Sequence, residues 1–297
     1  MELSKQCWTQ EDIPQFQKYL QSQSKGEYKS LWEQRIVNTK LPCLAVPSQT
    51  IKQIVNQISK GNFLSFLDLW IWQYHANTTI NGGLICKIKD FDLQKKYLDK
   101  YITLADNWAT IDCLKFKFTK DNKIQYFSYA KELVKSKYTF GRRLGLIICL
   151  KLCDDAQFTS EIFDIANSFA LEQEYYVNMA NAWLLAEMFA KHRDQTLKFL
   201  QNHNLNQFTI NKMISKCRDS FRVSQNDKDF LLKYKQKWDQ DLWQNIAPKI
   251  CNIQFRLIRF LFGCQESTFF IYSKFWLVCF GTEIILLPLL CSKYPTQ

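Results

Sequence analysis

Residues 63–74 have the sequence FLSFLDLWIWQY, and this stretch decides the fold class. Its apolar residues recur at steps of three and four, the spacing that gives an α-helix one buried face. They are Phe63, Phe66, Leu67, Trp70 and Tyr74. We therefore expect an amphipathic helix along this stretch rather than a strand.

The same spacing recurs along most of the first 240 residues. Ile162, Ile165, Ala166 and Phe169 form a second apolar face, and Phe230, Leu231 and Tyr234 begin a third. Ser224 precedes the third face, and with Asp227 it predicts a helix N-cap. Polar joints that separate the apolar stretches are expected near residues 47–48, 77–78, 90–92, 119–122, 137–139, 154–160 and 203–206.

Composition and joint spacing together predict an all-α fold. Gly (8) and Pro (6) are scarce among 297 residues, so turn residues are too few for a sandwich or barrel of short strands. Helix pairs of about 35 to 45 residues have the size of HEAT-like repeats. We expect residues 1–240 to form a curved α-solenoid of such repeats, although no strict sequence repeat is visible.

Residues 241–297 form a separate, apolar C-terminal extension of uncertain structure. The run from Phe275 to Cys291 is interrupted by Glu283 and Pro288, and its 17 residues fall short of a membrane-spanning helix. An additional packing helix or a poorly folded extension is favoured over a membrane anchor.

The net charge of +11 indicates a polyanionic partner, with nucleic acid ahead of a membrane surface. Residues 241–297 contain five Lys/Arg and three Asp/Glu, so +9 of this charge belongs to residues 1–240. A lysine-rich surface that only aids solubility explains the charge equally well.

The 11 cysteines include no C-x-x-C pair, which favours reduced, buried thiols in a cytoplasmic protein. The three histidines, His75, His192 and His203, have no metal-ligand spacing. We therefore expect no metal site and no cofactor, and a zinc hydrolase is disfavoured.

Four motifs carry the functional signal. They are NWATID at residues 107–112, FGRR at 140–143, EYYVNMANAWLL at 174–185 and NKMISKCRDSFRVS at 211–224. In this order and at these distances, they resemble the DNA alkylation repair enzymes, the HEAT-like-repeat alkylpurine DNA glycosylases. The resemblance extends from about Leu31 to Lys237, and the last two motifs are the most specific.

The resemblance implies catalytic roles for four residues. Trp108 and Trp183 resemble the two aromatic walls that lie against the deoxyribose of the damaged nucleotide. Asp112 resembles the catalytic carboxylate between them, and Arg143 resembles the arginine that braces the DNA backbone at the lesion. The expected partner is alkylated or distorted duplex DNA, bound by a monomer.

Further residues are candidates for DNA binding. Tyr175 and Tyr176 correspond to an aromatic pair at the start of the Trp183 helix, and Arg142 adjoins Arg143. The basic residues near the end of the helical region, which recur at helical spacing and would line phosphates, are Lys212, Lys216, Arg218 and Arg222.

The chemistry implied by the family suits these residue types. A purine alkylated at N3 or N7 is cationic and can leave as a neutral base without a general acid. The sugar that remains is positively charged and resembles an oxocarbenium ion. Asp112 would stabilise it and orient water, while the faces of Trp108 and Trp183 contact it. Because the nucleotide is held from the backbone side, the deep pocket of base-flipping enzymes is not needed.

Each candidate residue could also have a purely structural role and no function in DNA binding or catalysis. Trp108 and Trp183 could be core residues, Asp112 could cap a helix or pair with a lysine, and the two arginines could be a solvated helix start. The basic residues could form a surface face beside Asp219.

The chain departs from the family pattern before its second repeat. Many relatives have G-V-R-T-P there, whereas residues 45–49 are AVPSQ and contain no arginine. The short amino-terminal region resembles branches that lack an extra DNA-gripping helix. Three hypotheses therefore remain: an alkylpurine DNA glycosylase, a non-catalytic binder of bent, damaged or branched DNA, and a protein-interaction scaffold.

Overall fold

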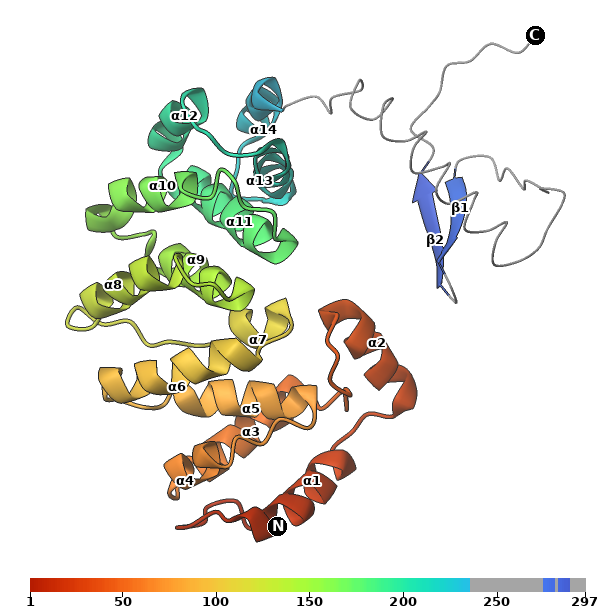
Figure 1. The fold of residues 1–297 in the computed structure, drawn as a ribbon. Helices are drawn as coiled ribbons and strands as arrows, with labels where there is room; N and C mark the ends of the chain where they lie inside the picture. The colour runs from red at the N-terminus through yellow and green to blue at the C-terminus, as the bar shows by residue number, and fades with distance from the viewer. Residues whose placement is uncertain (236–274, 281–282, 289–297) are drawn as a thin grey trace, which may run out of the picture. The chain divides into compact units, whose positions relative to one another are not determined.

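In a computed structural model, residues 1–235, 275–280 and 283–288 are described. The chain divides into two units, residues 1–236 and 237–297. The described part of the first unit contains α-helices and short 3₁₀ helices only (Figure 1). The α-helices are α1 (Ile13–Ser22), α2 (Glu27–Val37), α3 (Ser48–Ile58), α4 (Phe63–Asp68), α5 (His75–Ile85), α6 (Phe91–Leu104), α7 (Trp108–Asp112), α8 (Lys123–Leu133), α9 (Thr139–Leu152), α10 (Thr159–Asn167), α11 (Tyr175–Lys191), α12 (Arg193–Gln201), α13 (Gln207–Asp219) and α14 (Gln225–Leu231). The 3₁₀ helices are η1 (Gln10–Asp12), η2 (Ala156–Phe158) and η3 (Leu232–Tyr234).

The helices of the first unit form two rows. From α3 to α13 each odd-numbered helix packs on the next odd-numbered one, which makes a continuous inner row. The even-numbered helices α4, α6, α8, α10 and α12 lie beside this row, as Figure 1 shows. Such stacking of helix pairs confirms the predicted HEAT-like α-solenoid.

Most predicted helix boundaries near the polar joints are confirmed. α3 begins at Ser48, α9 begins at Thr139, and α6 begins after Asp90, whose side chain caps its first turn. Ser224 accepts a hydrogen bond from the backbone N–H of Asp227, so the predicted N-cap of α14 is present. Local polar side chains therefore define these helix ends.

The helix predicted across residues 63–74 is wrong beyond Asp68. Trp70 adopts a left-handed backbone conformation with φ of 45°, and its ring stacks on Tyr97. Asn77 then accepts a hydrogen bond from the backbone N–H of Tyr74, which caps the start of α5. The joint predicted at residues 77–78 thus lies inside the first turn of a helix.

The Tyr101 hydroxyl connects three consecutive helices. Tyr101 is fully buried in α6, and its hydroxyl oxygen lies 3.0 Å from the carbonyl oxygen of Thr78 and 3.1 Å from that of Thr110. Gly82 makes room for it, because a Cβ there would lie 2.6 Å from the hydroxyl oxygen. This buried polar contact holds α7 against α5.

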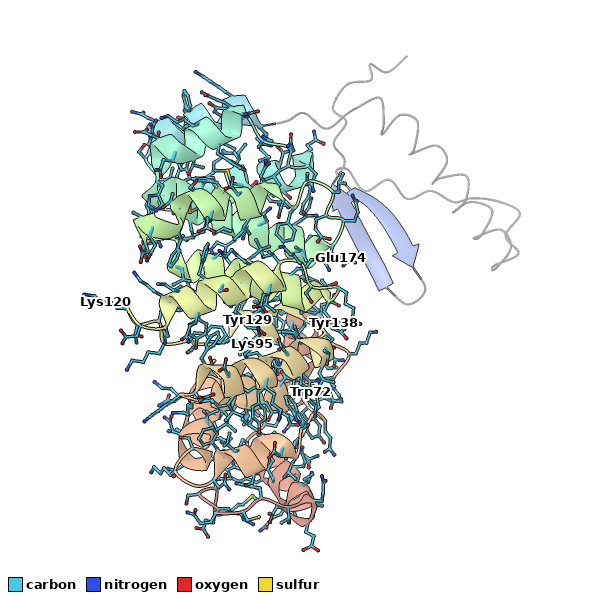
Figure 2. All side chains as sticks on the ribbon, turned by 60° about the vertical axis from the view of Figure 1, so that its left-hand side comes forward. Trp72, Lys95, Lys120, Tyr129, Tyr138 and Glu174 are labelled. Carbon is cyan, nitrogen blue, oxygen red and sulfur yellow. The ribbon has the colours of Figure 1, made fainter. Side chains whose placement is uncertain are left out.

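Aromatic side chains also fill the space between neighbouring even-numbered helices. The ammonium of Lys95 lies 5.2 Å from the centre of the Tyr129 ring, and the two are seen side by side in Figure 2. The Tyr129 hydroxyl donates to Asp99 at 2.7 Å. Contacts of this kind join α6 to α8.

The described cysteines of the first unit are free thiols, and most are buried. Burial raises the pKa of Cys86, Cys149 and Cys217 to about 12. Cys149 and Cys217 are part of the apolar core, and Cys86 packs against it.

The second unit contains a β-hairpin. β1 (Phe275–Phe280) pairs antiparallel with β2 (Glu283–Pro288), and Phe275 lies opposite Pro288. The alternative of an additional packing helix is therefore wrong for residues 275–280 and 283–288. The predicted domain boundary at 240/241 falls outside the described residues. Within the described residues, no helix has the length and apolar character needed to cross a membrane.

We predict that Tyr101→Phe destabilises the protein by about 1 to 3 kcal/mol, because two buried carbonyl groups lose their shared donor. Equilibrium unfolding in urea measures this change. Tyr28→Phe is the matched control, since Tyr28 is 80% exposed and should change stability by less than about 0.5 kcal/mol. Equal stability of Tyr101→Phe and the wild type would contradict the role of this hydroxyl.

Candidate active site and nucleic-acid interface

The sequence-predicted residues lie on four consecutive helices of the inner row. Trp108 and Asp112 are the first and last residues of α7, and the two arginines lie in the first turns of α9. Tyr175 and Tyr176 begin α11, and the basic residues of the last motif lie on or just after α13. Stacking of the repeats therefore brings together segments that are about 30 residues apart in the chain.

Asp112 and Arg143 form a two-point ion pair. The Arg143 Nε donates to Asp112 Oδ1 at 2.9 Å, and its Nη2 donates to Oδ2 at 2.6 Å. The remaining nitrogen, Nη1, donates to the backbone carbonyl of Tyr176 at 2.5 Å. The side chains of Arg143 and Asp112 are 6% and 13% exposed, so the pair is largely screened from water. One guanidinium thus connects α7, α9 and α11.

Tyr175 and Tyr176, at the start of α11, lie beside this ion pair. The Tyr176 ring lies against Phe140, and its hydroxyl accepts a hydrogen bond from the Asn38 amide at 2.9 Å. Tyr175 is exposed and packs edge-on against Tyr176 and near Phe208. Tyr175 is therefore accessible to a ligand, whereas Tyr176 already contacts Asn38 and Phe140.

Trp108 is held by α2. Its indole nitrogen donates to the backbone carbonyl of Ile36 at 3.3 Å, and its ring packs on Val37, Cys43 and Ala109. Trp108 is only partly buried, so part of the residue remains accessible. The amino-terminal region thus supplies the support for this aromatic residue.

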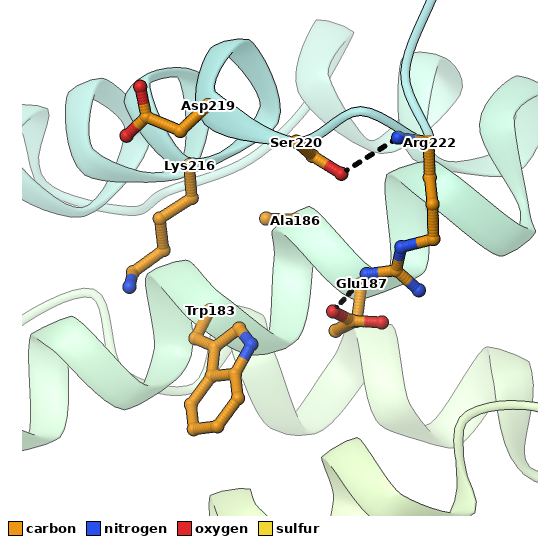
Figure 3. Close-up of a pocket in the computed structure, with 7 residues that line it drawn as sticks. All are labelled: Trp183, Ala186, Glu187, Lys216, Asp219, Ser220 and Arg222. Atoms are coloured by element: carbon orange, nitrogen blue, oxygen red, sulfur yellow. Dashed lines mark hydrogen bonds and ion pairs between the residues drawn. The ribbon is translucent and has the colours of Figure 1, made fainter.

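Trp183 lines an open pocket of about 280 Å³ between α11 and α13 (Figure 3). The other residues that line it are Ala186, Glu187, Lys216, Asp219, Ser220 and Arg222. The Lys216 ammonium lies 5.8 Å from the centre of the Trp183 ring, within the range of cation–π attraction. The pocket therefore presents an aromatic face together with side chains of both charge signs.

Electrostatics place Lys216 near the ion pair as well. Burial lowers the pKa of the Lys216 ammonium below its usual range, and the Arg143 charge lowers this pKa further. Asp112 and Asp219 oppose the shift. Lys216, which lines the Trp183 pocket, is therefore within electrostatic range of the Asp112–Arg143 pair.

The candidate DNA-binding cations fall into two groups. Arg142 donates to both carboxylate oxygens of Glu172 at 2.7 and 3.2 Å, and Arg222 pairs with Glu187. Among the residues that the structure describes, Lys212, Lys216 and Arg218 form no ion pair. The cations Lys212, Lys216 and Arg218 are therefore better candidates for phosphate binding than Arg142 and Arg222.

Asn178 explains part of the EYYVNMANAWLL motif. Its buried amide nitrogen donates to the carbonyl of Glu172, and its oxygen accepts hydrogen bonds from Asn206 and Thr209. These contacts fix the start of α13 against α11. Asn178 therefore positions the helix that carries Lys212 and Lys216.

Several residues that support the site were not predicted from the sequence. Asn38, Glu172 and Glu187 orient Tyr176, Arg142 and Arg222, respectively. Glu172 lies just before the EYY motif, which is a weak signal, whereas nothing in the local sequence pairs Asn38 with a residue 138 positions away.

The stacked helix pairs form a HEAT-like α-solenoid. Its inner row brings a carboxylate, a guanidinium and aromatic rings to one region. A sequence model of the DNA alkylation repair enzyme family matches residues 8–216. The chain belongs to this family, and membership implies a DNA substrate. A search of curated proteins finds no match to the chain.

We predict that Arg143→Met destabilises the protein by about 3 to 5 kcal/mol, because it leaves the Asp112 carboxylate largely buried and unpaired. Thermal and urea unfolding measure the effect. Lys131→Met is the matched control, since the Lys131–Glu161 pair is about half exposed and should contribute less than about 1 kcal/mol. Equal losses of stability in the two variants would show that the Asp112–Arg143 pair stabilises the protein no more than an exposed ion pair does.

Proposed function

We propose that this protein is a DNA glycosylase that releases cationic N3- or N7-alkylated purines from duplex DNA. The observation that carries the proposal is the Asp112–Arg143 pair, which is held at the junction of α7, α9 and α11 with Trp108 on one of these helices and Trp183 on another. The family match over residues 8–216 supports the substrate class.

In the proposed reaction, the bond between the sugar C1′ and the purine nitrogen breaks. Its electron pair leaves with the purine, which becomes neutral, and positive charge develops on the sugar. Asp112 stabilises this charge, and the electron-rich faces of Trp108 and Trp183 contact the sugar. Water then adds to C1′, and Asp112 accepts its proton.

Arg143 has two functions in this proposal. It holds the carboxylate of Asp112 in one orientation before DNA binds. The guanidinium has five N–H donors, and three are engaged by Asp112 and Tyr176. In this proposal the two remaining donors bind a DNA phosphate, which requires local movement because the Arg143 side chain is only 6% exposed. A phosphate bound there would draw Arg143 toward the backbone and leave Asp112 more negative beside the sugar.

Lys212, Lys216 and Arg218 would hold the duplex on α13. Lys212 and Arg218 are exposed, and Lys216 is half-buried over Trp183. Arg142 and Arg222 are already neutralised by glutamates, so we assign them structural roles beside the interface.

Two observations favour a second candidate, a non-catalytic protein that binds bent, damaged or branched DNA. Both oxygens of Asp112 are occupied by Arg143, and residues 45–49 lack the arginine found in many relatives. This candidate predicts salt-dependent DNA binding without release of a base.

The first test is base release from methylated duplex DNA. We expect wild-type protein to release 3-methyladenine or 7-methylguanine, and Asp112→Asn to lower the rate by about 100-fold or more. Liquid chromatography of the free base measures the rate. Glu161→Gln, which removes an exposed carboxylate on α10, is the control and should retain the wild-type rate.

Circular dichroism and DNA binding show whether Asp112→Asn remains folded. A folded Asp112→Asn protein with the wild-type rate would remove Asp112 from the mechanism. DNA binding by the wild type without base release would instead support the non-catalytic candidate.

The second test concerns the cations of α13. Combined substitution of Lys212, Lys216 and Arg218 by Gln should lower the slope of log affinity against log salt by roughly 0.9 for each phosphate that the variant no longer binds. The charge-matched control substitutes three lysines that are already ion-paired outside the inner row, Lys95, Lys123 and Lys131. Fluorescence anisotropy with duplex DNA measures both slopes. Identical slopes in the two triple variants would move the DNA surface away from α13.

A further inference from the structure

Three side chains with metal-binding groups meet beside Trp108. Glu33 lies on α2, Cys43 lies in the loop that follows α2, and His75 is the first residue of α5. One ligand atom from each lies within 4.8 Å of the other two. The His75 Nδ1 and the Glu33 Oε1 are 3.0 Å apart.

The three groups are largely enclosed. Cys43 is 7% exposed and His75 is 5% exposed, whereas the Glu33 side chain is 27% exposed. Glu33 is the only polar partner of the imidazole within the described residues, because the buried His75 Nε2 has none. A ring with one hydrogen bond of this kind can exchange it for a coordinate bond. The site is open to solvent on the Glu33 side.

The surrounding backbone orients the three groups. The second oxygen of Glu33 accepts a hydrogen bond from the backbone N–H of Ala45 at 2.7 Å. The backbone N–H of His75 donates to the carbonyl of Pro42 at 3.0 Å, which ties the loop to α5. Outer contacts of this type fix ligands in known metal sites. The loop that carries Cys43 is thus held by two of the segments that contribute ligands.

Two carboxylates bring negative charge to the site. Glu33 is one of the three candidate ligands, and Asp106 accepts hydrogen bonds from Thr39 and from the backbone N–H of Lys40, in the loop that carries Cys43. Within the described residues, neither carboxylate has a Lys or Arg ion-pair partner. A bound cation would neutralise this charge.

We propose that Glu33, Cys43 and His75 bind a divalent transition-metal ion, for which Zn²⁺ is the best chemical fit. Zn²⁺ takes thiolate, imidazole and carboxylate ligands, and a site with three protein ligands keeps a fourth position for water. Bond lengths of about 2.0 to 2.3 Å place tetrahedral ligand atoms roughly 3.3 to 3.8 Å apart. Because no separation exceeds 4.8 Å and the His75–Glu33 separation is 3.0 Å, shifts of about 1 Å or less are sufficient.

The ion would fasten α2 and its loop to α5. Cys43 and Val37 pack on the Trp108 ring, and Ile36 accepts the indole hydrogen bond. The metal would therefore stabilise the support of Trp108 rather than take part in base release. Its test is independent of the glycosylase assay.

The test uses the full chain after removal of metal by a chelator. We expect one equivalent of Zn²⁺ to bind, measured by competition with a chromophoric chelator, and Co²⁺ to give a thiolate-to-cobalt charge-transfer band. Cys43→Ser should abolish the band, and His75→Gln and Glu33→Gln should each weaken Zn²⁺ binding at least about 10-fold. Cys113→Ser, which removes an exposed thiol elsewhere, is the matched control and should retain both properties.

Absence of Zn²⁺ binding by the wild type would overturn the proposal. Retention of the cobalt band and of wild-type affinity in Cys43→Ser would also overturn it, because the thiolate would then come from another cysteine. If Cys43→Ser does not fold, Zn²⁺ binding by His75→Gln and Glu33→Gln tests the site. Glu33→Gln is expected to fold because the Glu33 side chain is partly exposed. Wild-type Zn²⁺ affinity in both of them would refute the site.

Discussion

The two-point contact between Arg143 and Asp112 is the interaction on which the site depends. Taking a carboxylate and a guanidinium out of water is costly, and only close, well-oriented pairing compensates for this cost. The pair can form because α7, α9 and α11 are consecutive members of the inner row. In turn, the pair fixes the distance between the helices that carry Trp108 and Trp183. Fold and candidate chemistry therefore depend on the same contact.

Much of the fold could be predicted because helix starts and apolar faces are local properties. Ser224 caps α14, and Asp90 caps α6, as their sequence positions indicate. The prediction failed at residues 63–74 because the chain turns at Trp70, where the contact with Tyr97 outweighs helical periodicity. The C-terminal hairpin was also missed, since a short apolar run does not distinguish a strand from a buried helix.

The site could be predicted only in part. The family resemblance singled out Asp112 and Arg143, but it did not indicate that Arg143 pairs with Asp112 or that its neighbour Arg142 pairs with Glu172. Adjacent residues on a helix point in different directions, and their partners come from other repeats. The cluster of Glu33, Cys43 and His75 could not be predicted from the sequence. Its members are 10 and 32 positions apart and form no recognisable spacing.

The buried cysteines have a chemical consequence for a member of an alkylation repair family. Electrophiles react with thiolates far faster than with thiols. Cys86, Cys149 and Cys217 remain protonated at neutral pH because burial raises the pKa of each thiol to about 12. Methylating agents are therefore expected to react slowly with these three thiols.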